Sequence, residues 1–271
     1  MASLGQIIFG SMITLIILFS AIIILILALS FSGNLSEVRS SSMFPIANLG
    51  DDKLLSCYLN TAENNLREVK VTWEKQDLTG LVYQYANGAP ELTDQNSQFK
   101  ERTQLFPDAL LKGNASLLLR SVTSRDDGQY TCSISSSGGG GKVDIHLRTA
   151  AFSAPTFKFS DGVLTAQANR WLPKPNVTWT NYDGDFLVGS SSFTQNSAGI
   201  FSVVSTLPSV NISDTYTCRI GNKLVTSVSR ATVTDSGVLK NTYFTYSAAP
   251  SLLASTYLSI MTAVLCICYL T

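Results

Sequence analysis

The sequence contains a single histidine, His146, among 271 residues. Histidine is the usual acid–base catalyst near neutral pH and the commonest metal ligand, so its scarcity excludes most histidine-dependent catalysis and most zinc sites. Basic and acidic residues number 19 each, with no basic excess that would indicate nucleic-acid binding and no acidic block. We therefore predict no catalytic residues, no metal, no cofactor and no small-molecule substrate, and we expect a binding protein rather than an enzyme.

Both ends of the chain lack charged residues, since the first charge is Glu37 and the last is Lys240. The almost wholly apolar run at 7–31 is longer than a usual secretory core and has no basic residue before it. It is also long enough to cross a bilayer. We predict a signal peptide at 1–32, with a retained membrane anchor as the alternative. Either one places the middle of the chain in the secretory lumen.

The C-terminal run at 252–271 is just long enough to cross a bilayer, but no basic residue follows it to mark a cytoplasmic side. The small residues Ser247, Ala248 and Ala249 before it match the attachment site of a glycosylphosphatidylinositol anchor. We predict either a transmembrane segment or such an anchor signal, preceded by a stalk at 236–251. Both alternatives tether the chain to the plasma membrane without a cytoplasmic tail.

The middle of the chain carries signs of an extracellular environment. Four N-x-S/T glycosylation motifs occur there, at Asn34, Asn114, Asn176 and Asn211. Four such motifs behind a signal-like segment predict a glycosylated surface on the external side of the plasma membrane. In that oxidising compartment we expect Cys57 and Cys132 to form a disulfide.

Short runs rich in Val, Thr, Tyr and Leu alternate with turn residues through the middle of the chain, which indicates an all-β fold. Trp73 follows Cys57, and Tyr130 stands two residues before Cys132 in the segment DDGQYTC. In an immunoglobulin-like sandwich, two cysteines bridge the sheets, a tryptophan packs on the bridge, and a tyrosine forms a corner at this spacing. The distance between the cysteines leaves room for the extra strands of a variable-type domain, which we assign to 33–149.

Asp126 and Asp127 are adjacent carboxylates, but neighbouring residues of a strand or turn point in different directions. Arg102 precedes a predicted strand and is placed to meet Asp126 across the bottom of the domain, as in variable-type domains. We therefore predict a structural salt bridge between Arg102 and Asp126 rather than acid–base chemistry.

The pattern recurs once, farther along the chain. Trp179 in PKPNVTW is a second core tryptophan after Trp73, and Cys218 ends a second tyrosine-corner segment, DTYTC. Ala166 occupies the position of the first cysteine, and the shorter spacing predicts a constant-type domain at 150–235. Cys218 is expected as a reduced, buried thiol, and an intermolecular disulfide is the alternative.

Several segments resemble one known family. RWLPKPNVTW at 170–179, KGNASL at 112–117 and TAAFSAP at 149–155 are similar to segments of the B7/butyrophilin family of T-cell costimulatory and coinhibitory ligands. The resemblance covers essentially the whole chain and departs at Ala166, where the family keeps a cysteine. It implies a cell-surface ligand that binds a protein receptor on T cells and negatively regulates T-cell activation and cytokine production. A cell-adhesion protein that binds homophilically or heterophilically, without immune inhibition, is the alternative.

Alternation of side chains along strands predicts which residues of the first domain face outward. With Trp73, Tyr130 and Cys132 directed inward, one sheet face exposes Thr72, Glu74, Val82, Gln84, Ser133, Ser135, Asp144 and His146. The resemblance implies that this face contacts the receptor.

Four consecutive glycines at 138–141 join two strands at the tip of the first domain. We expect a highly flexible loop, whose ordering on binding would cost conformational entropy. Gly139 and Gly140 are candidates for receptor contact in a loop that moulds to its partner, with a plain connector between strands as the alternative.

Overall fold

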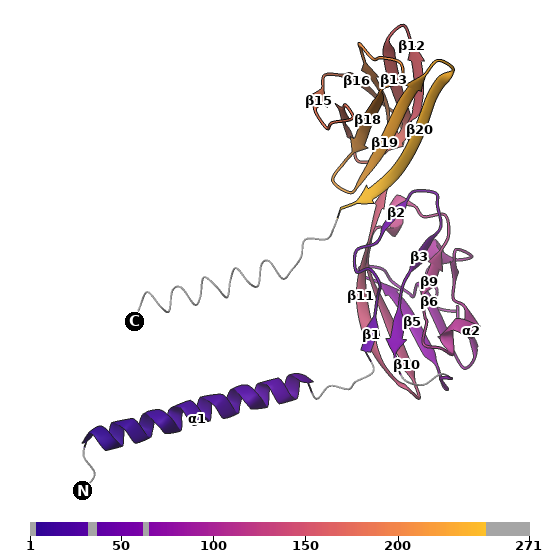
Figure 1. Cartoon of the computed structure of the whole chain (residues 1–271). Coiled ribbons are helices and arrows are strands. Elements are labelled where there is room, and N and C mark those ends of the chain that lie inside the picture. Colours follow the sequence, from indigo (N-terminus) through magenta and orange to yellow (C-terminus); the bar gives the residue numbers. More distant parts are fainter. Residues whose placement is uncertain (1–3, 32–36, 62–64, 248–271) are drawn as a thin grey trace.

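The computed structural model describes residues 4–31, 37–61 and 65–247 (Figure 1). A long helix, α1 (Leu4–Phe31), precedes two domains built of strands. Within α1, residue 5 and residues 11–26 are exposed. Among the described residues, no helix combines the length and the apolar character needed to cross a membrane. The signal peptide or anchor at 1–32 stays a prediction, and the membrane segment or anchor signal at 252–271 lies outside the described residues.

The first domain is a sandwich of two β-layers. One layer is a six-stranded sheet in the order β2-β11-β10-β5-β6-β7, in which β2 is parallel to β11 and the other neighbours are antiparallel. The other strands form the sheet β3-β9-β8 and the pair β1-β4. The bounds are β1 (Glu37–Arg39), β2 (Ile46–Asn48), β3 (Lys53–Leu55), β4 (Tyr58–Asn60), β5 (Lys70–Lys75), β6 (Tyr83–Ala86), β7 (Ala89–Pro90), β8 (Thr103–Gln104), β9 (Leu117–Leu119), β10 (Gly128–Ser136) and β11 (Gly139–Ala150), with short helices η1 (Ser97–Phe99), α2 (Pro107–Leu110) and η2 (Ser124–Asp126).

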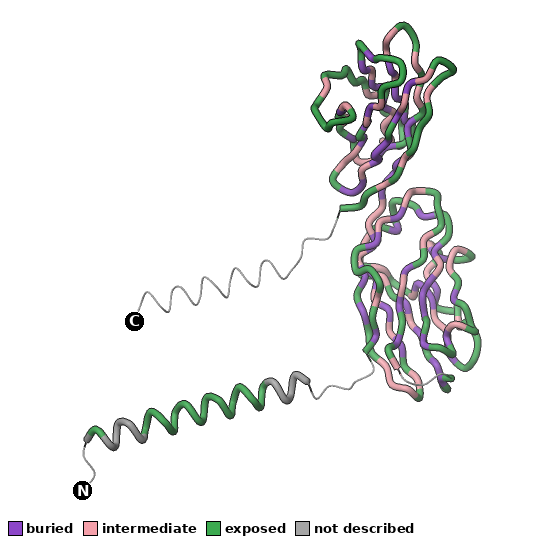
Figure 2. Tube along the Cα trace, in the orientation of Figure 1, coloured by how far each residue is buried: buried purple, intermediate pink, exposed green. Residues whose placement is uncertain are grey.

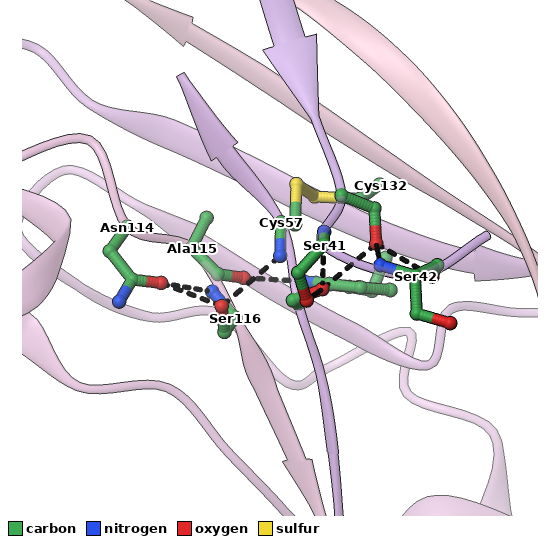
Figure 3. The surroundings of a disulfide bond; sticks show 10 residues. Ser41, Ser42, Cys57, Asn114, Ala115, Ser116 and Cys132 are labelled. Atoms are coloured by element: carbon green, nitrogen blue, oxygen red, sulfur yellow. Dashed lines mark hydrogen bonds between the residues drawn. A yellow bond between two sulfur atoms is a disulfide. The ribbon is translucent and has the colours of Figure 1, made fainter. Parts of the chain in front are cut away.

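The core of this domain forms where alternate residues of both layers point inward, and it appears as the buried interior of the lower domain in Figure 2. The predicted disulfide joins Cys57 to Cys132 inside it, as Figure 3 shows. Trp73 is fully buried in the same cluster, and its indole N–H donates to the Ala115 carbonyl at 3.0 Å. The hydroxyl of Tyr130 donates to a backbone carbonyl four residues earlier, which is the tyrosine corner expected from the sequence.

The second domain is a sandwich of a four-stranded and a five-stranded sheet, so the chain has the predicted all-β architecture of two tandem immunoglobulin-like sandwiches. The sheet orders are β12-β13-β17-β16 and β15-β14-β18-β19-β20. The bounds are β12 (Thr156–Ser160), β13 (Val163–Trp171), β14 (Asn176–Thr180), β15 (Phe186–Leu187), β16 (Ser190–Gln195), β17 (Phe201–Leu207), β18 (Thr215–Gly221), β19 (Val225–Thr234) and β20 (Gly237–Tyr246). Ala166, Trp179 and Cys218 are buried in its core, and Cys218 is a free thiol.

Strand β20 corrects the expectation of a stalk from residue 236 onward. Residues 237–246 instead extend the second domain, because a two-residue turn after Thr234 lets β20 pair with β19 along its whole length. Val238 and Phe244 of β20 pack against the core of this domain. The additional strand runs back toward the first domain, as the yellow arrow in Figure 1 shows.

The end of β20 lies at the junction between the two domains. The ring of Phe152, just beyond β11, lies 5.1 Å from that of Phe244 and 6.0 Å from that of Tyr246, measured between centroids. The backbone N–H of Phe152 also donates to the side-chain oxygen of Asn48 at 3.0 Å, and the Arg170 guanidinium donates to the Leu49 carbonyl. Phe152 and β20 both belong to the second domain, so the aromatic packing orders its near end, whereas the two hydrogen bonds link it to the first domain.

Candidate binding face

The candidate site is the exposed side of the six-stranded sheet in the first domain, which we call the outer face. Its residues alternate with the buried residues of β5, β10 and β11, so the pleat of the strands directs them to solvent. The outer face is defined by Lys70, Thr72, Glu74, Gln84, Thr131, Ser133, Ser135, Lys142, Asp144 and His146.

Strand register arranges the outer face in rows. Gln84 pairs with Thr72, Thr72 with Ser133, and Ser133 with Lys142, which places these four residues side by side across four strands. The next row consists of Glu74, Thr131 and Asp144. Sequence reasoning selected most residues of the outer face but missed Lys70, Thr131 and Lys142, although the same alternation directs all three outward.

Glu91 orders the end of the first row. Its carboxylate accepts a hydrogen bond from the Gln84 amide at 2.7 Å and another from the Asn87 amide at 2.8 Å. Asn87 and Gly88 both have positive φ angles, as the tight turn between β6 and β7 requires. Gln84 is therefore held in place before any partner binds, which reduces the entropy lost on binding.

The second row carries two exposed carboxylates. The Thr131 hydroxyl donates to the Asp144 carboxylate at 2.7 Å, and Glu74 lies on the other side of Thr131. Lys70 and Lys142 are exposed nearer the tip of the domain, in the rows formed with Ser135 and Ser133. The outer face thus presents two ammonium groups near the tip, two carboxylates in the second row and the Glu91 carboxylate beside Gln84, a charge pattern that selects a partner by charge complementarity.

His146 lies at the edge of the outer face, beside two apolar side chains that sequence reasoning did not select. Its backbone N–H donates to the Met43 carbonyl at 2.7 Å, and its ring lies 6.3 Å from that of Phe44. Met43 is 43% exposed and Phe44 is 39% exposed. Buried aromatic residues and methionines are enriched in protein interfaces, so this edge adds apolar contact area to an otherwise polar face.

The structure corrects the prediction for Val82, which is fully buried in the core instead of facing outward. Its N–H donates to the Trp73 carbonyl at 2.9 Å, although Tyr83 is the register partner of Trp73. Two consecutive residues therefore face one residue of β5, as in a β-bulge, and both point inward. The simple alternation used to place Val82 does not hold across such a bulge.

The four glycines at 138–141 also differ from expectation. Gly139 and Gly140 begin β11 and pair with Ser136 and Ser135, so the connection to β10 is a tight turn and not a long flexible loop. A Cβ atom on Gly140 would lie 3.1 Å from the Cα of Ser135. Glycine is needed there because the two strands approach so closely.

Arg102 and Asp126 form the predicted ion pair, with 2.5 Å between guanidinium nitrogen and carboxylate oxygen. The carboxylate also accepts a hydrogen bond from the Thr123 backbone N–H, whereas Asp127 accepts one from the Thr149 backbone N–H. The two adjacent carboxylates therefore serve separate structural contacts. Across the described ranges, no three His, Cys, Asp or Glu side chains form a group suited to a metal ion.

The predicted glycosylation sites that can be located lie on the surface. Asn114, Asn176 and Asn211 are exposed, and Asn34 lies outside the described residues. The Asn114 side-chain oxygen accepts hydrogen bonds from the backbone N–H and the hydroxyl of Ser116, and the backbone N–H of Cys57 donates to that hydroxyl (Figure 3). This motif lies close to the disulfide and away from the outer face. Glycosylation of these sites remains a prediction.

Comparison with known proteins gives consistent results. Residues 42–148 match the Immunoglobulin V-set domain family. The chain is 34% identical to V-set domain-containing T-cell activation inhibitor 1 of Homo sapiens over 275 residues, covering 98% of this chain and 97% of that protein. It is 29% identical to Butyrophilin-like protein 2 of Homo sapiens over 192 residues, covering 68% of this chain and 40% of that protein.

Among solved structures, the crystal structure of the human B7-H4 IgV-like domain is 33% identical and has a TM-score of 0.39, covering 42% of this chain and 96% of that chain. The family assignment depends on the sequence relatives, because the first of them is similar over nearly the whole length of both proteins. The chain therefore belongs to the B7/butyrophilin family, in the group of V-set domain-containing T-cell activation inhibitor 1.

Proposed function

We propose that this chain is a ligand on the external side of the plasma membrane that binds a receptor on T cells and restrains T-cell activation and cytokine production. The inhibitory direction follows from the relative that covers nearly the whole chain and whose name describes it as a T-cell activation inhibitor. The two sandwiches present a recognition surface, and the outer face of the first domain is the part that contacts the receptor.

The observation that carries this proposal is the preorganised and uncovered outer face. Glu91 fixes Gln84, Thr131 fixes Asp144, and no described segment of the chain covers the rows that contain them. Rigid polar groups of this kind select a partner at low entropic cost. Met43 and Phe44 at its edge supply the apolar contact that gives most interfaces their affinity.

The test uses the full chain displayed on cells that are mixed with activated T cells. We expect Glu74→Arg to reduce binding at least about tenfold, because it reverses one of the two charges in the second row. Cytokine release should rise in parallel as restraint is lost. Gln84→Ala should weaken binding less, since it removes a neutral contact.

Asp108→Arg is the matched control, since it makes the same charge change on α2, outside the outer face. Equal loss of binding for Glu74→Arg and Asp108→Arg would contradict a role for the outer face. Aggregation among displaying cells, with no binding to T cells, would instead support the adhesion alternative.

A further inference from the structure

Strand β20 is the edge strand of the five-stranded sheet in the second domain, and no other described strand is hydrogen bonded to its outer edge. It pairs with β19 through all ten of its residues without a register shift. The other edge strands in the described part of the chain have six residues or fewer. A long edge presents a row of unpaired backbone N–H and C=O groups with which another strand can pair.

The edge of β20 lacks the features that usually prevent such pairing. Natural edge strands are protected by proline, by bulges or by charged side chains, and β20 has no proline, no bulge and only one charged residue, Lys240. The ammonium group of Lys240 does not guard the edge, because it donates to the Pro155 carbonyl of the same chain at 3.2 Å. Leu239 and Tyr243 are 67% and 52% exposed.

The register identifies which backbone groups of β20 are free. Thr234 and Gly237 flank a two-residue turn and pair with each other, so they exchange hydrogen bonds. In an antiparallel ladder such bonded pairs recur at every second residue. The backbone groups of the odd-numbered residues of β20 are therefore hydrogen bonded to β19. The free N–H and C=O groups belong to the even-numbered residues Val238, Lys240, Thr242, Phe244 and Tyr246.

We propose that the edge of β20 pairs with β20 of a second copy of this chain, antiparallel about a two-fold axis at Asn241. In this register the free backbone groups of Lys240 meet those of Thr242 of the second copy, and those of Val238 meet those of Phe244. The two five-stranded sheets become one continuous sheet. A two-fold contact of this kind uses the same patch on both copies and closes on itself.

Side-chain complementarity selects this register. Leu239 lies opposite Tyr243 of the second copy on the exposed side of the sheet, and such aliphatic–aromatic cross-strand pairs stabilise sheets. An axis at Lys240 would place two like charges directly opposite each other, which is unfavourable. An axis at Thr242 would leave Tyr243 opposite Asn241 and lose the apolar pair.

The first test is a disulfide across the axis in the full chain. In the proposed register the two Asn241 residues form a non-bonded pair with Cα atoms about 4.5 Å apart, within the range that a disulfide spans. Asn241→Cys should therefore give a covalent dimer on a non-reducing gel of protein from the cell surface. Thr245→Cys is the control, since the two residues at 245 would be about 27 Å apart.

Three results would overturn the proposal. One is an Asn241→Cys chain that shows no more covalent dimer than the unchanged chain. Another is equal dimer formation by Asn241→Cys and Thr245→Cys, which would indicate random contact. The third is a disulfide between the cysteine introduced at position 241 and a different protein, with no dimer of this chain. That result would show that another polypeptide occupies the edge.

A charge exchange tests the register without cysteine chemistry. The double variant Leu239→Lys with Tyr243→Lys places like charges opposite each other and should reduce co-precipitation of two differently tagged full chains at least about tenfold. Leu239→Glu with Tyr243→Lys places opposite charges together and should restore it. Phe186→Lys with Val188→Lys adds the same charge at the opposite edge of this sheet and should have no effect.

Equal association of the two Leu239 double variants would refute the register. The proposal stands apart from receptor binding, since β20 belongs to the second domain and the outer face to the first. Variants of the outer face should leave the disulfide at position 241 unchanged.

Discussion

At the scale of single residues, Cys218 shows the difference between the two domains. It lies opposite Trp179 in the register of β14 and β18 and is fully buried. The position where its disulfide partner is expected holds Ala166. Burial raises the pKa of the Cys218 thiol to about 12, so the group stays protonated and behaves as a small apolar side chain. The second domain therefore depends on packing alone where the first has a covalent bond.

Replacing Ala166 with cysteine should restore that bond. A disulfide stabilises a domain by about 2–4 kcal/mol, mainly by constraining the unfolded chain. We expect Ala166→Cys to raise the melting temperature of the second domain by several degrees in calorimetry, and the gain should vanish on reduction. Ala168→Cys, at the next inward position of β13, is the matched control. No gain from Ala166→Cys would contradict the assignment of residue 166 as the partner of Cys218.

Asp126 makes the first domain sensitive to acid. Burial alone would raise the pKa of this carboxyl, but hydrogen bonds from Arg102, Thr123 and Gln98 and the charge of Arg102 together lower it. A carboxyl with a lowered folded-state pKa contributes stability above its unfolded pKa of about 3.9, and this contribution is lost as the pH falls through the folded value.

We expect Asp126→Asn to destabilise the first domain by about 3 kcal/mol at pH 7, since it leaves Arg102 without its partner. The loss should shrink below about pH 4, where the unchanged chain loses the same contribution. Urea unfolding at pH 7 and pH 3 measures both values. Asp108→Asn on α2 serves as the exposed control, and an equal effect of both variants at both pH values would contradict this account.

At the scale of elements, β20 completes the second domain. Phe244 packs against Phe152 and the core, whereas the adjacent Tyr243 is half exposed on the other side of the strand. We expect Phe244→Ala to lower the stability of the second domain by about 2 kcal/mol, because it removes a large, partly buried side chain. Tyr243→Ala should cost far less in the same thermal unfolding experiment. Similar small effects of both would indicate that β20 is not part of the folded domain.

The elements that sequence reasoning located are those with fixed landmarks. Cys57, Trp73 and Tyr130 set the phase of β5 and β10, so their outward residues followed from alternation. Val82 was wrongly predicted to face outward, because a bulge depends on backbone hydrogen bonds that no sequence pattern indicates.

β20 was missed for a different reason. Its residues alternate and include the β-branched and aromatic types that favour strands, but an immunoglobulin-like sandwich requires no strand at that point. Likewise, the glycine run suggested a flexible loop. In the structure, glycine is needed because β10 and β11 approach too closely to leave space for a side chain. Tertiary contacts decided both cases.

At the scale of the whole molecule, the junction links the two domains through a small number of groups. Asn48 and Leu49 of the first domain receive hydrogen bonds from Phe152 and Arg170, and the ring of Phe152 packs against β20. We expect Arg170→Ala, which removes the exposed side chain that donates to the Leu49 carbonyl, to leave each sandwich folded but to broaden the distribution of distances between them. Spin labels on the two domains would measure this distribution, and an unchanged distribution would contradict a bracing role for this hydrogen bond.

The return of β20 to the junction also constrains how the protein can rest on a cell. Ser247 is hydrogen bonded beside that junction, to the carbonyls of Leu224 and Lys223. Position 252 lies five residues farther along the chain, and five residues span at most about 18 Å. If the chain enters the bilayer at 252, both sandwiches must recline along the membrane instead of standing end-on. A receptor on an opposing cell would then approach the molecule from its flank.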